Sequence, residues 1–225
     1  MAELLIVSTP IGNMKDISFR AVETLRTVNL ILSEDTRETQ KILLEYQINT
    51  PQLSYRDQNH TRIVDYIKDF LSQGKDIALV SDNGTPTISD PGFKLVRELR
   101  KNNIPISIIP GPTAFASALA ISGLPTDSFI FLGFLPKKSG GRSKLLLEYG
   151  NLPSTLILYE SPYRIRGLLK DIQENLGNRL VCLAKDLTKK FESVKTVPVE
   201  YFVKEQMPME KGEYVVLVVK EGYSL

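Results

Sequence analysis

Four short runs of β-branched and aliphatic residues constrain the fold of this chain more than any other feature. They are ELLIVST (3–9), LILSE (30–34), IALVSD (77–82) and ISIIPG (106–111). Each run leads into a loop that begins with glycine, proline or an acidic residue. Continuous apolar runs of this length are typical of strands buried on both faces of a parallel sheet.

Amphipathic segments lie between these runs. Segment 16–28 carries apolar residues at spacings of three and four, and segment 61–74 does the same before it ends on Gly74. This spacing predicts helices with one apolar face. Strand and helix therefore alternate through the first half, which predicts an α/β domain with a mostly parallel sheet.

The second half has a different pattern. Strand signals occur at 129–135, 155–161, 180–187, 199–203 and 213–220. One clear helix is expected to start on Ser161, with Pro162 at its first position. This pattern predicts a second α/β domain with a mixed sheet, and the turn-rich segment LPTDSF places the boundary near residue 121. The expected domains are residues 1–120 and 121–225.

Composition excludes several classes of protein. No apolar run approaches the ~18–20 residues that cross a bilayer, so no membrane association is expected. The first residues read as a buried strand and not as a signal peptide, which predicts a cytoplasmic protein. With Cys182 and His60 as its single cysteine and histidine, the chain is not expected to bind a metal. A net charge of +2 is too small to indicate nucleic-acid binding unless cations are clustered.

Four loops containing glycine or proline follow expected strands, at 9–13, 81–92, 110–115 and 159–164. In parallel α/β sheets ligands bind beyond the carboxyl ends of the strands, so these loops are placed to line a site with main-chain groups. The alternative is that they are ordinary tight turns. The Walker pattern and the dinucleotide pattern GxGxxG are both missing, which leaves open another adenosine-bearing ligand.

The order of the motifs along the chain is more specific than any single one. They are VSTPIGN (7–13), EDTR (34–37), SDNGTPTISDPG (81–92), PGPTA (110–114), SGLPTD (122–127), GFLPKK (133–138), YESPYR (159–164), LTKKFE (187–192) and KGEYV (211–215). Together they resemble the ribosomal RNA small subunit methyltransferase I family of the tetrapyrrole-methylase fold. The resemblance implies two α/β domains, S-adenosylmethionine bound in the cleft between them, and a homodimer.

The resemblance also implies which residues contact the cofactor. They are Pro10, Asn83, Gly84, Thr85, Ile88, Thr113, Ala114, Glu160 or its neighbour Tyr159, and Leu187. Ile88 and Leu187 could equally be plain core residues. The chain departs from the family pattern at Asn83, where alanine is usual, at Tyr163, where histidine is usual, and in SVKTV (193–197), where an Arg-Gly pair is usual.

The family reaction is methylation of the 2′-hydroxyl of a cytidine ribose in small-subunit (16S) ribosomal RNA. In that reaction Asp35 or Glu34 would orient or deprotonate the hydroxyl, and Arg37 would hold a phosphate. The alternative is that Asp35 or Thr36 caps the helix that follows while Arg37 is solvated.

Contacts to RNA are expected from two basic clusters, 136–144 and 185–192, unless these are solvated connectors. The first cluster, with its pair of glycines, reads as a mobile loop. A weaker prediction is that Tyr55, Arg56 and Asn59 read an extruded base.

Two rival functions share the expected cofactor loops. One is a tetrapyrrole C-methyltransferase, although the motifs EDTR, YESPYR and LTKKFE favour RNA as the substrate. The other is a module that binds S-adenosylmethionine without catalysing methyl transfer.

Overall fold

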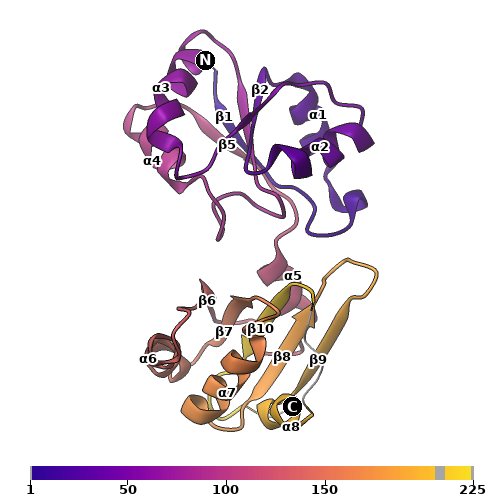
Figure 1. Ribbon diagram of the computed structural model, residues 1–225, viewed down its shortest axis with the longest axis vertical. Coiled ribbons are helices and arrows are strands. Elements are labelled where there is room, and N and C mark those ends of the chain that lie inside the picture. Colours follow the sequence, from indigo (N-terminus) through magenta and orange to yellow (C-terminus); the bar gives the residue numbers. More distant parts are fainter. Residues whose placement is uncertain (1, 206–210, 224–225) are drawn as a thin grey trace. The chain divides into compact units, whose positions relative to one another are not determined.

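The computed structural model describes residues 2–205 and 211–223. It divides into two compact units, Met1–Thr113 and Ala114–Leu225 (Figure 1). Helix α5 (Ala114–Ile121) belongs to the second unit, because it packs against strands β7 (Thr155–Glu160) and β10 (Tyr214–Val218). The division therefore falls earlier than the boundary expected near residue 121.

The first unit is built on a five-stranded sheet in which every pair is parallel, as the apolar runs predict. Its strands are β1 (Leu4–Val7), β2 (Leu30–Ser33), β3 (Gln52–Ser54), β4 (Ile77–Val80) and β5 (Ile106–Ile109), in the order β3-β2-β4-β1-β5. The three-residue edge strand β3 was not expected. It contains a single apolar residue, Leu53, and so gives no strand signal.

Helices cover both faces of this sheet. They are α1 (Phe19–Thr27), α2 (Thr36–Glu45), α3 (His60–Ser72) and α4 (Phe93–Lys101), with a short 3₁₀ turn, η1, at Met14–Asp16. Leu30 and Leu32 pack with α3 and α4, whereas Ile31 between them packs with α1 and α2. Successive side chains of a strand point to opposite faces, so β1, β2, β4 and β5 each contribute to two separate cores.

The second unit holds a mixed sheet, also as expected. Its strands are β6 (Phe129–Phe134), β7, β8 (Leu180–Lys185), β9 (Ser193–Pro198) and β10, in the order β6-β7-β10-β8-β9. Strands β6 and β7 are parallel, and the other three neighbouring pairs are antiparallel. The fold is therefore α/β in both units.

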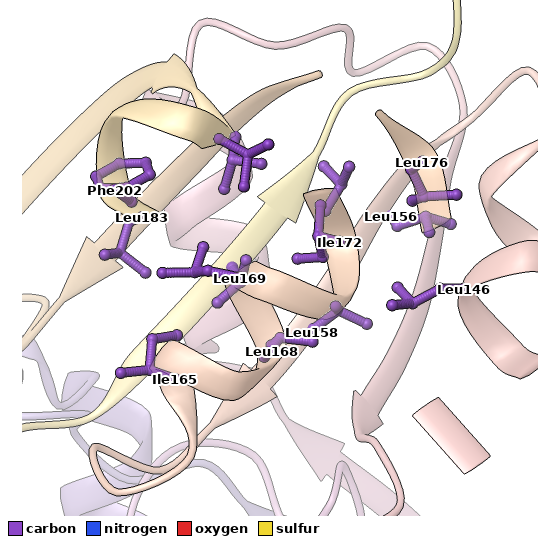
Figure 2. Packing of buried hydrophobic residues seen from close by; sticks show 14 of the residues in the cluster. Leu146, Leu156, Leu158, Ile165, Leu168, Leu169, Ile172, Leu176, Leu183 and Phe202 are labelled. Carbon is purple, nitrogen blue, oxygen red and sulfur yellow. The ribbon is translucent and has the colours of Figure 1, made fainter. Parts of the chain in front are cut away.

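One face of this mixed sheet is covered by α6 (Ser139–Gly150), α7 (Ile165–Leu176) and α8 (Val199–Lys204). Figure 2 shows how Ile165, Leu168, Leu169 and Ile172 of α7 pack over the strands, with Phe202 of α8 beside them. All five side chains are at most 3% exposed. The apolar face of α7 is therefore the centre of the second core.

Three sequence predictions for this unit differ from the structure. Segment 199–203, expected to be a strand, is helix α8, because Val199 and Phe202 are buried at a helical spacing of three after Pro198. Segment 136–144, expected to be a mobile loop, runs into α6, which accommodates its pair of glycines. The helix expected from Ser161 begins later, at Ile165, after a turn in which the Ser161 carbonyl accepts from the Arg164 and Ile165 amides.

Candidate functional site

Three loops at the carboxyl ends of β1, β4 and β5 are tied together by the hydroxyl of Thr85. Its Oγ1 lies 2.9 Å from Ser8 Oγ, 2.8 Å from Thr113 Oγ1 and 3.2 Å from the carbonyl oxygen of Pro112. These partners come from the loops that follow β1 and β5, while Thr85 belongs to the loop after β4. The three strand ends expected to converge do so within the first unit.

Main-chain bonds reinforce this junction. The Thr9 amide donates to the Gly84 carbonyl at 2.8 Å, and Thr9 Oγ1 donates to the Ser81 carbonyl at 3.1 Å. Gly84 has φ +88°, a conformation that glycine adopts without strain, and a Cβ there would lie 3.3 Å from Cγ2 of Ile11. The glycine is therefore required by the loop itself. Gly84→Val would therefore disturb the loop itself and not only a bound ligand.

The rest of this loop, which we call the 81–92 loop, holds an unusual backbone. Thr87 and Ser89 have φ of 73° and 64°, although neither is glycine. Gly92 closes the loop, and its amide donates to Asp57 Oδ1 at 3.1 Å. Non-glycine residues with strained backbone angles of this kind are found most often at active sites and ligand-binding loops. Of the predicted contacts here, Asn83 and Ile88 are exposed, whereas Pro10 in the loop after β1 is buried.

Asp35 caps the N-terminus of α2, as the helix-cap alternative predicts. Its Oδ1 accepts from the Arg37 amide and from Arg37 Nε, both at 2.9 Å, and its Oδ2 accepts from Arg37 Nη2 at 2.5 Å. Arg37 holds the pKa of Asp35 well below its usual range. Asp35 is therefore a firmly ionised cap and anchor for the exposed Arg37 guanidinium.

Three other carboxylates near the start of α2 have raised pKa values, in contrast to Asp35. Burial raises the pKa of Glu34 above its usual value, and the nearby Asp82 charge adds to the shift. Burial also raises the pKa of Asp82, whose Oδ1 accepts from the Asp35 amide at 3.0 Å. Burial and then repulsion from Glu34 raise the pKa of Asp90 to about 7. A positive charge at this edge of the sheet would be stabilised by all three.

The predicted contacts in the second unit gather at the end of β7. Tyr159 Oη accepts from the Phe115 amide at 3.1 Å, and its ring stands edge-on to Phe131 and Phe134, with centroids 5.0 and 5.6 Å away. Glu160 is buried, and its carboxylate accepts from the Ser161 amide and from Arg164 Nη2, both at 2.7 Å. Glu160 thus fixes the start of the turn after β7.

Two other predicted contacts of this unit lie further along the chain. Ala114 opens α5 and is half-buried. Leu187 is buried between Asp186 and Thr188, which both have positive φ. The predicted contacts therefore fall into two groups, one in each unit.

Three residues predicted to contact RNA serve the fold instead. Arg142 is buried on α6, where its Nε lies 2.5 Å from Asp171 Oδ2 and its Nη1 donates to the Lys137 carbonyl. Tyr55 is 1% exposed, so its ring cannot stack on a base. Asn59 accepts from the Arg56 amide and so stabilises the turn before α3.

Sequence reasoning missed Asp82 and Asp90, although both lie in the 81–92 loop. A carboxylate in a glycine- and proline-rich segment looks like ordinary turn chemistry. The distinguishing property is burial beside other carboxylates, and a linear sequence does not show which loops meet.

Neither a metal site nor a membrane span is found in the described part of the chain. No group of three or more histidine, cysteine, aspartate or glutamate side chains among those residues could hold a metal ion. Among the same residues no helix combines the length and apolar character needed to cross a bilayer.

Comparison with known proteins gives consistent matches. Residues 3–202 match the family model described as Tetrapyrrole (Corrin/Porphyrin) Methylases. A protein of Escherichia coli O157:H7 named ribosomal RNA small subunit methyltransferase I is 44% identical over 98% of this chain and 78% of its own length. A protein of the same name from Thermotoga maritima is 46% identical over 84% of this chain and 85% of its own length.

Solved structures share the fold at low sequence identity. Uroporphyrin-III C-methyltransferase from Thermus thermophilus, crystallised with S-adenosylhomocysteine, is 18% identical with a TM-score of 0.67 and covers 98% of this chain and 98% of its own. A diphthine synthase structure is 14% identical with a TM-score of 0.75 and covers 99% of this chain and 92% of its own.

Proposed function

Since this chain belongs to the ribosomal RNA small subunit methyltransferase I family of tetrapyrrole methylases, we propose that it methylates small-subunit ribosomal RNA. The cofactor is S-adenosylmethionine, and the acceptor is the 2′-hydroxyl of a cytidine ribose. The observation that carries the proposal is the match to relatives of that name over nearly the whole chain.

The loops of the first unit fit this cofactor. The Thr85 junction fixes three strand-end loops, which can then hold a nucleoside and an amino acid through main-chain groups. The raised pKa values of Glu34, Asp82 and Asp90 indicate an edge that favours a positive charge such as a sulfonium. When bound, S-adenosylmethionine supplies a methyl group that is already activated for transfer.

The proposed cofactor contacts come from both units. The first contributes Pro10, Asn83, Gly84, Thr85, Ile88 and Thr113, and the second contributes Ala114, Tyr159, Glu160 and Leu187. In the first unit the Thr85 junction brings Thr85 and Thr113 within hydrogen-bond distance of each other, and Thr9, next to Pro10, donates to Gly84. In the second, Tyr159 and Glu160 are held by the bonds described above.

Glu34 is the side chain best suited to accept the proton that the ribose hydroxyl loses. Its raised pKa makes it a stronger base than Asp35, whose pKa Arg37 lowers. Asp35 positions the exposed Arg37 guanidinium, which is free on its other side to pair with a phosphate. The roles proposed for Glu34, Asp35 and Arg37 are therefore base, anchor and phosphate contact.

Two further properties complete the proposal. The protein acts as a homodimer, and it works in the cytoplasm, where ribosomal RNA is the substrate. Light scattering across a range of concentrations tests the first of these, and a monomer at every concentration would contradict it.

Labelled methyl transfer tests the function against its rivals. The protein is incubated with labelled S-adenosylmethionine and either small ribosomal subunits that lack the modification or a uroporphyrinogen. We expect label in the RNA and none in the tetrapyrrole. Label in the tetrapyrrole alone would identify a C-methyltransferase. Cofactor binding without transfer to either would identify a non-catalytic module.

A further inference from the structure

Three exposed aromatic rings lie at or beyond the carboxyl ends of strands in the second unit. Phe134, Tyr163 and Phe191 are 58%, 90% and 73% exposed. Each follows or ends a different strand, namely β6, β7 or β8. Single exposed apolar residues are common on protein surfaces, but three exposed rings on loops at the same end of one sheet indicate a binding surface, which we call the patch.

Strand direction places the loops that carry these rings at the same end of the sheet. Strand β6 is parallel to β7, and β10 is antiparallel to both β7 and β8, so β6, β7 and β8 all run in the same direction. Their ends are level, because Phe134 pairs with Tyr159, and Tyr214 of β10 pairs with both Glu160 and Lys185. In the order β6-β7-β10-β8, three strand spacings separate β6 from β8, which is roughly 14 Å.

The surroundings of the rings are cationic. Segments 134–138, 160–166 and 185–192 carry seven lysines and arginines against three carboxylates. Three of these cations are paired, Arg164 with Glu160, Lys185 with Asp186 and Lys189 with Glu213, and the surroundings remain net positive. Lys190 Nζ lies 5.6 Å from the centroid of the Phe191 ring. The patch therefore offers aromatic faces within a positive field.

We propose that Phe134, Tyr163 and Phe191 form a stacking platform for unpaired bases of an RNA strand whose phosphates contact the surrounding lysines and arginines. Proteins that bind single-stranded RNA combine these two features, since every base has a face to stack and every nucleotide carries a phosphate. A protein partner fits less well, because lysine is depleted at protein interfaces. The inference rests on the proposed function and adds to it that the target is single-stranded where it is bound.

The chain has no tryptophan, so one introduced ring reports on one position. Tyr163→Trp and Phe191→Trp are prepared in the full chain, with Tyr66→Trp on α3 as the control at a half-exposed tyrosine outside the patch. An unpaired RNA oligonucleotide should quench the fluorescence of the first two variants and leave the control unchanged. Equal quenching by a duplex of the same sequence, or none by the unpaired strand, would overturn the platform.

Leucine variants give the energetic test. Tyr163→Leu and Phe191→Leu should each weaken affinity for the unpaired RNA about 5- to 100-fold, with the slope of affinity against salt unchanged, since no cation is removed. Parental affinity in both would overturn the proposal, as would fluorescence that changes with protein concentration alone, which would identify a second copy as the occupant. Methyl transfer by the parent protein is measured alongside, so that failure of the platform is distinguished from failure of the proposed function.

Discussion

The side chains beyond the ends of the parallel strands differ in chemical character between the two units. In the first unit the strand ends carry a hydroxyl junction at Thr85 and carboxylates such as Glu34 and Asp90, whose pKa values are raised. In the second they carry exposed rings, among them Tyr163 and Phe191, surrounded by cations. We therefore propose that the first sheet supplies the charge that favours the cofactor's sulfonium and the second sheet supplies the platform for RNA, while Tyr159 and Arg37 keep the roles proposed for them above.

The largest effect is expected from removing the proposed base of the first unit. Glu34→Gln keeps the shape of the side chain but removes its capacity to accept a proton, so methyl transfer should fall by ~10²–10⁴. Affinity for RNA should not change, because the second unit supplies the platform. Single-turnover methylation of saturating RNA measures the first quantity, and Glu38→Gln, on the exposed side of α2, is the control.

The pH profile sharpens the same test. Glu34 is active when ionised and its pKa is raised, so the parental rate should rise with pH through that raised pKa and then level off. A Glu34→Gln enzyme with the parental rate and the parental pH profile would exclude Glu34 as the base.

The next largest effect concerns a cation of the second unit that we assign to the fold. Arg142→Met leaves Asp171 buried without its ion-pair partner, which should lower the free energy of unfolding by about 3–5 kcal/mol. Lys144→Met, two residues along the same helix and exposed, should change it by less than about 0.5 kcal/mol. Denaturant unfolding compares them. Similar stabilities for the two variants would contradict the buried ion pair and support the prediction that Arg142 contacts RNA.

A smaller effect is expected at the junction of the three loops. Thr85→Val keeps the volume of the side chain and removes the hydroxyl that contacts Ser8 and Thr113, so affinity for S-adenosylmethionine should fall about tenfold. Thr27→Val on α1, which also removes a bonded hydroxyl, is the control. Calorimetric titration gives both affinities. If the affinity for RNA fell and the affinity for the cofactor did not, the assignment of the cofactor to the loops of the first unit would be wrong.

The smallest effect is a gain of stability. The pKa of Asp90 is raised to about 7 from an ordinary value near 4, so the folded state retains its proton between those values and parental stability falls as pH rises from about 4 to 7. Asp90→Asn should reduce this dependence, and the remainder should come from Glu34 and Asp82, whose pKa values are also raised. At pH 8 it should raise the free energy of unfolding by about 1 kcal/mol, after discounting for solvent screening of a partly exposed group. Thermal unfolding at pH 5 and pH 8 measures the change, and a variant with the parental slope would show that Asp90 ionises freely.

Sequence predicted the first unit better than the second for a physical reason. Strands buried on both faces, such as β4, must be apolar throughout, so their signal survives without knowledge of their neighbours. Segment 199–203 is also rich in β-branched and aromatic residues, yet Val199 and Phe202 bury one face of a short helix. Composition alone does not separate these outcomes when a segment is this short.

The candidate site was predictable as a set of loops but not as a set of roles. Glycine and proline after apolar runs located the 81–92 loop, and helix-cap preference gave Asp35 its alternative role. The contact between the Asp82 carboxylate and the Asp35 amide joins residues 47 apart in the chain. Such pairings determine which carboxylate is basic, and they exist only in the folded chain.

The most direct test of the account is to map the transferred methyl group. Small subunits that lack the modification are treated with the purified protein and S-adenosylmethionine, and their RNA is digested and analysed by mass spectrometry. The account predicts one added methyl group on the ribose of a cytidine, at a position that is unpaired in the subunit. A methyl group on a base, or no added methyl group in RNA treated with active, cofactor-bound protein, would contradict it.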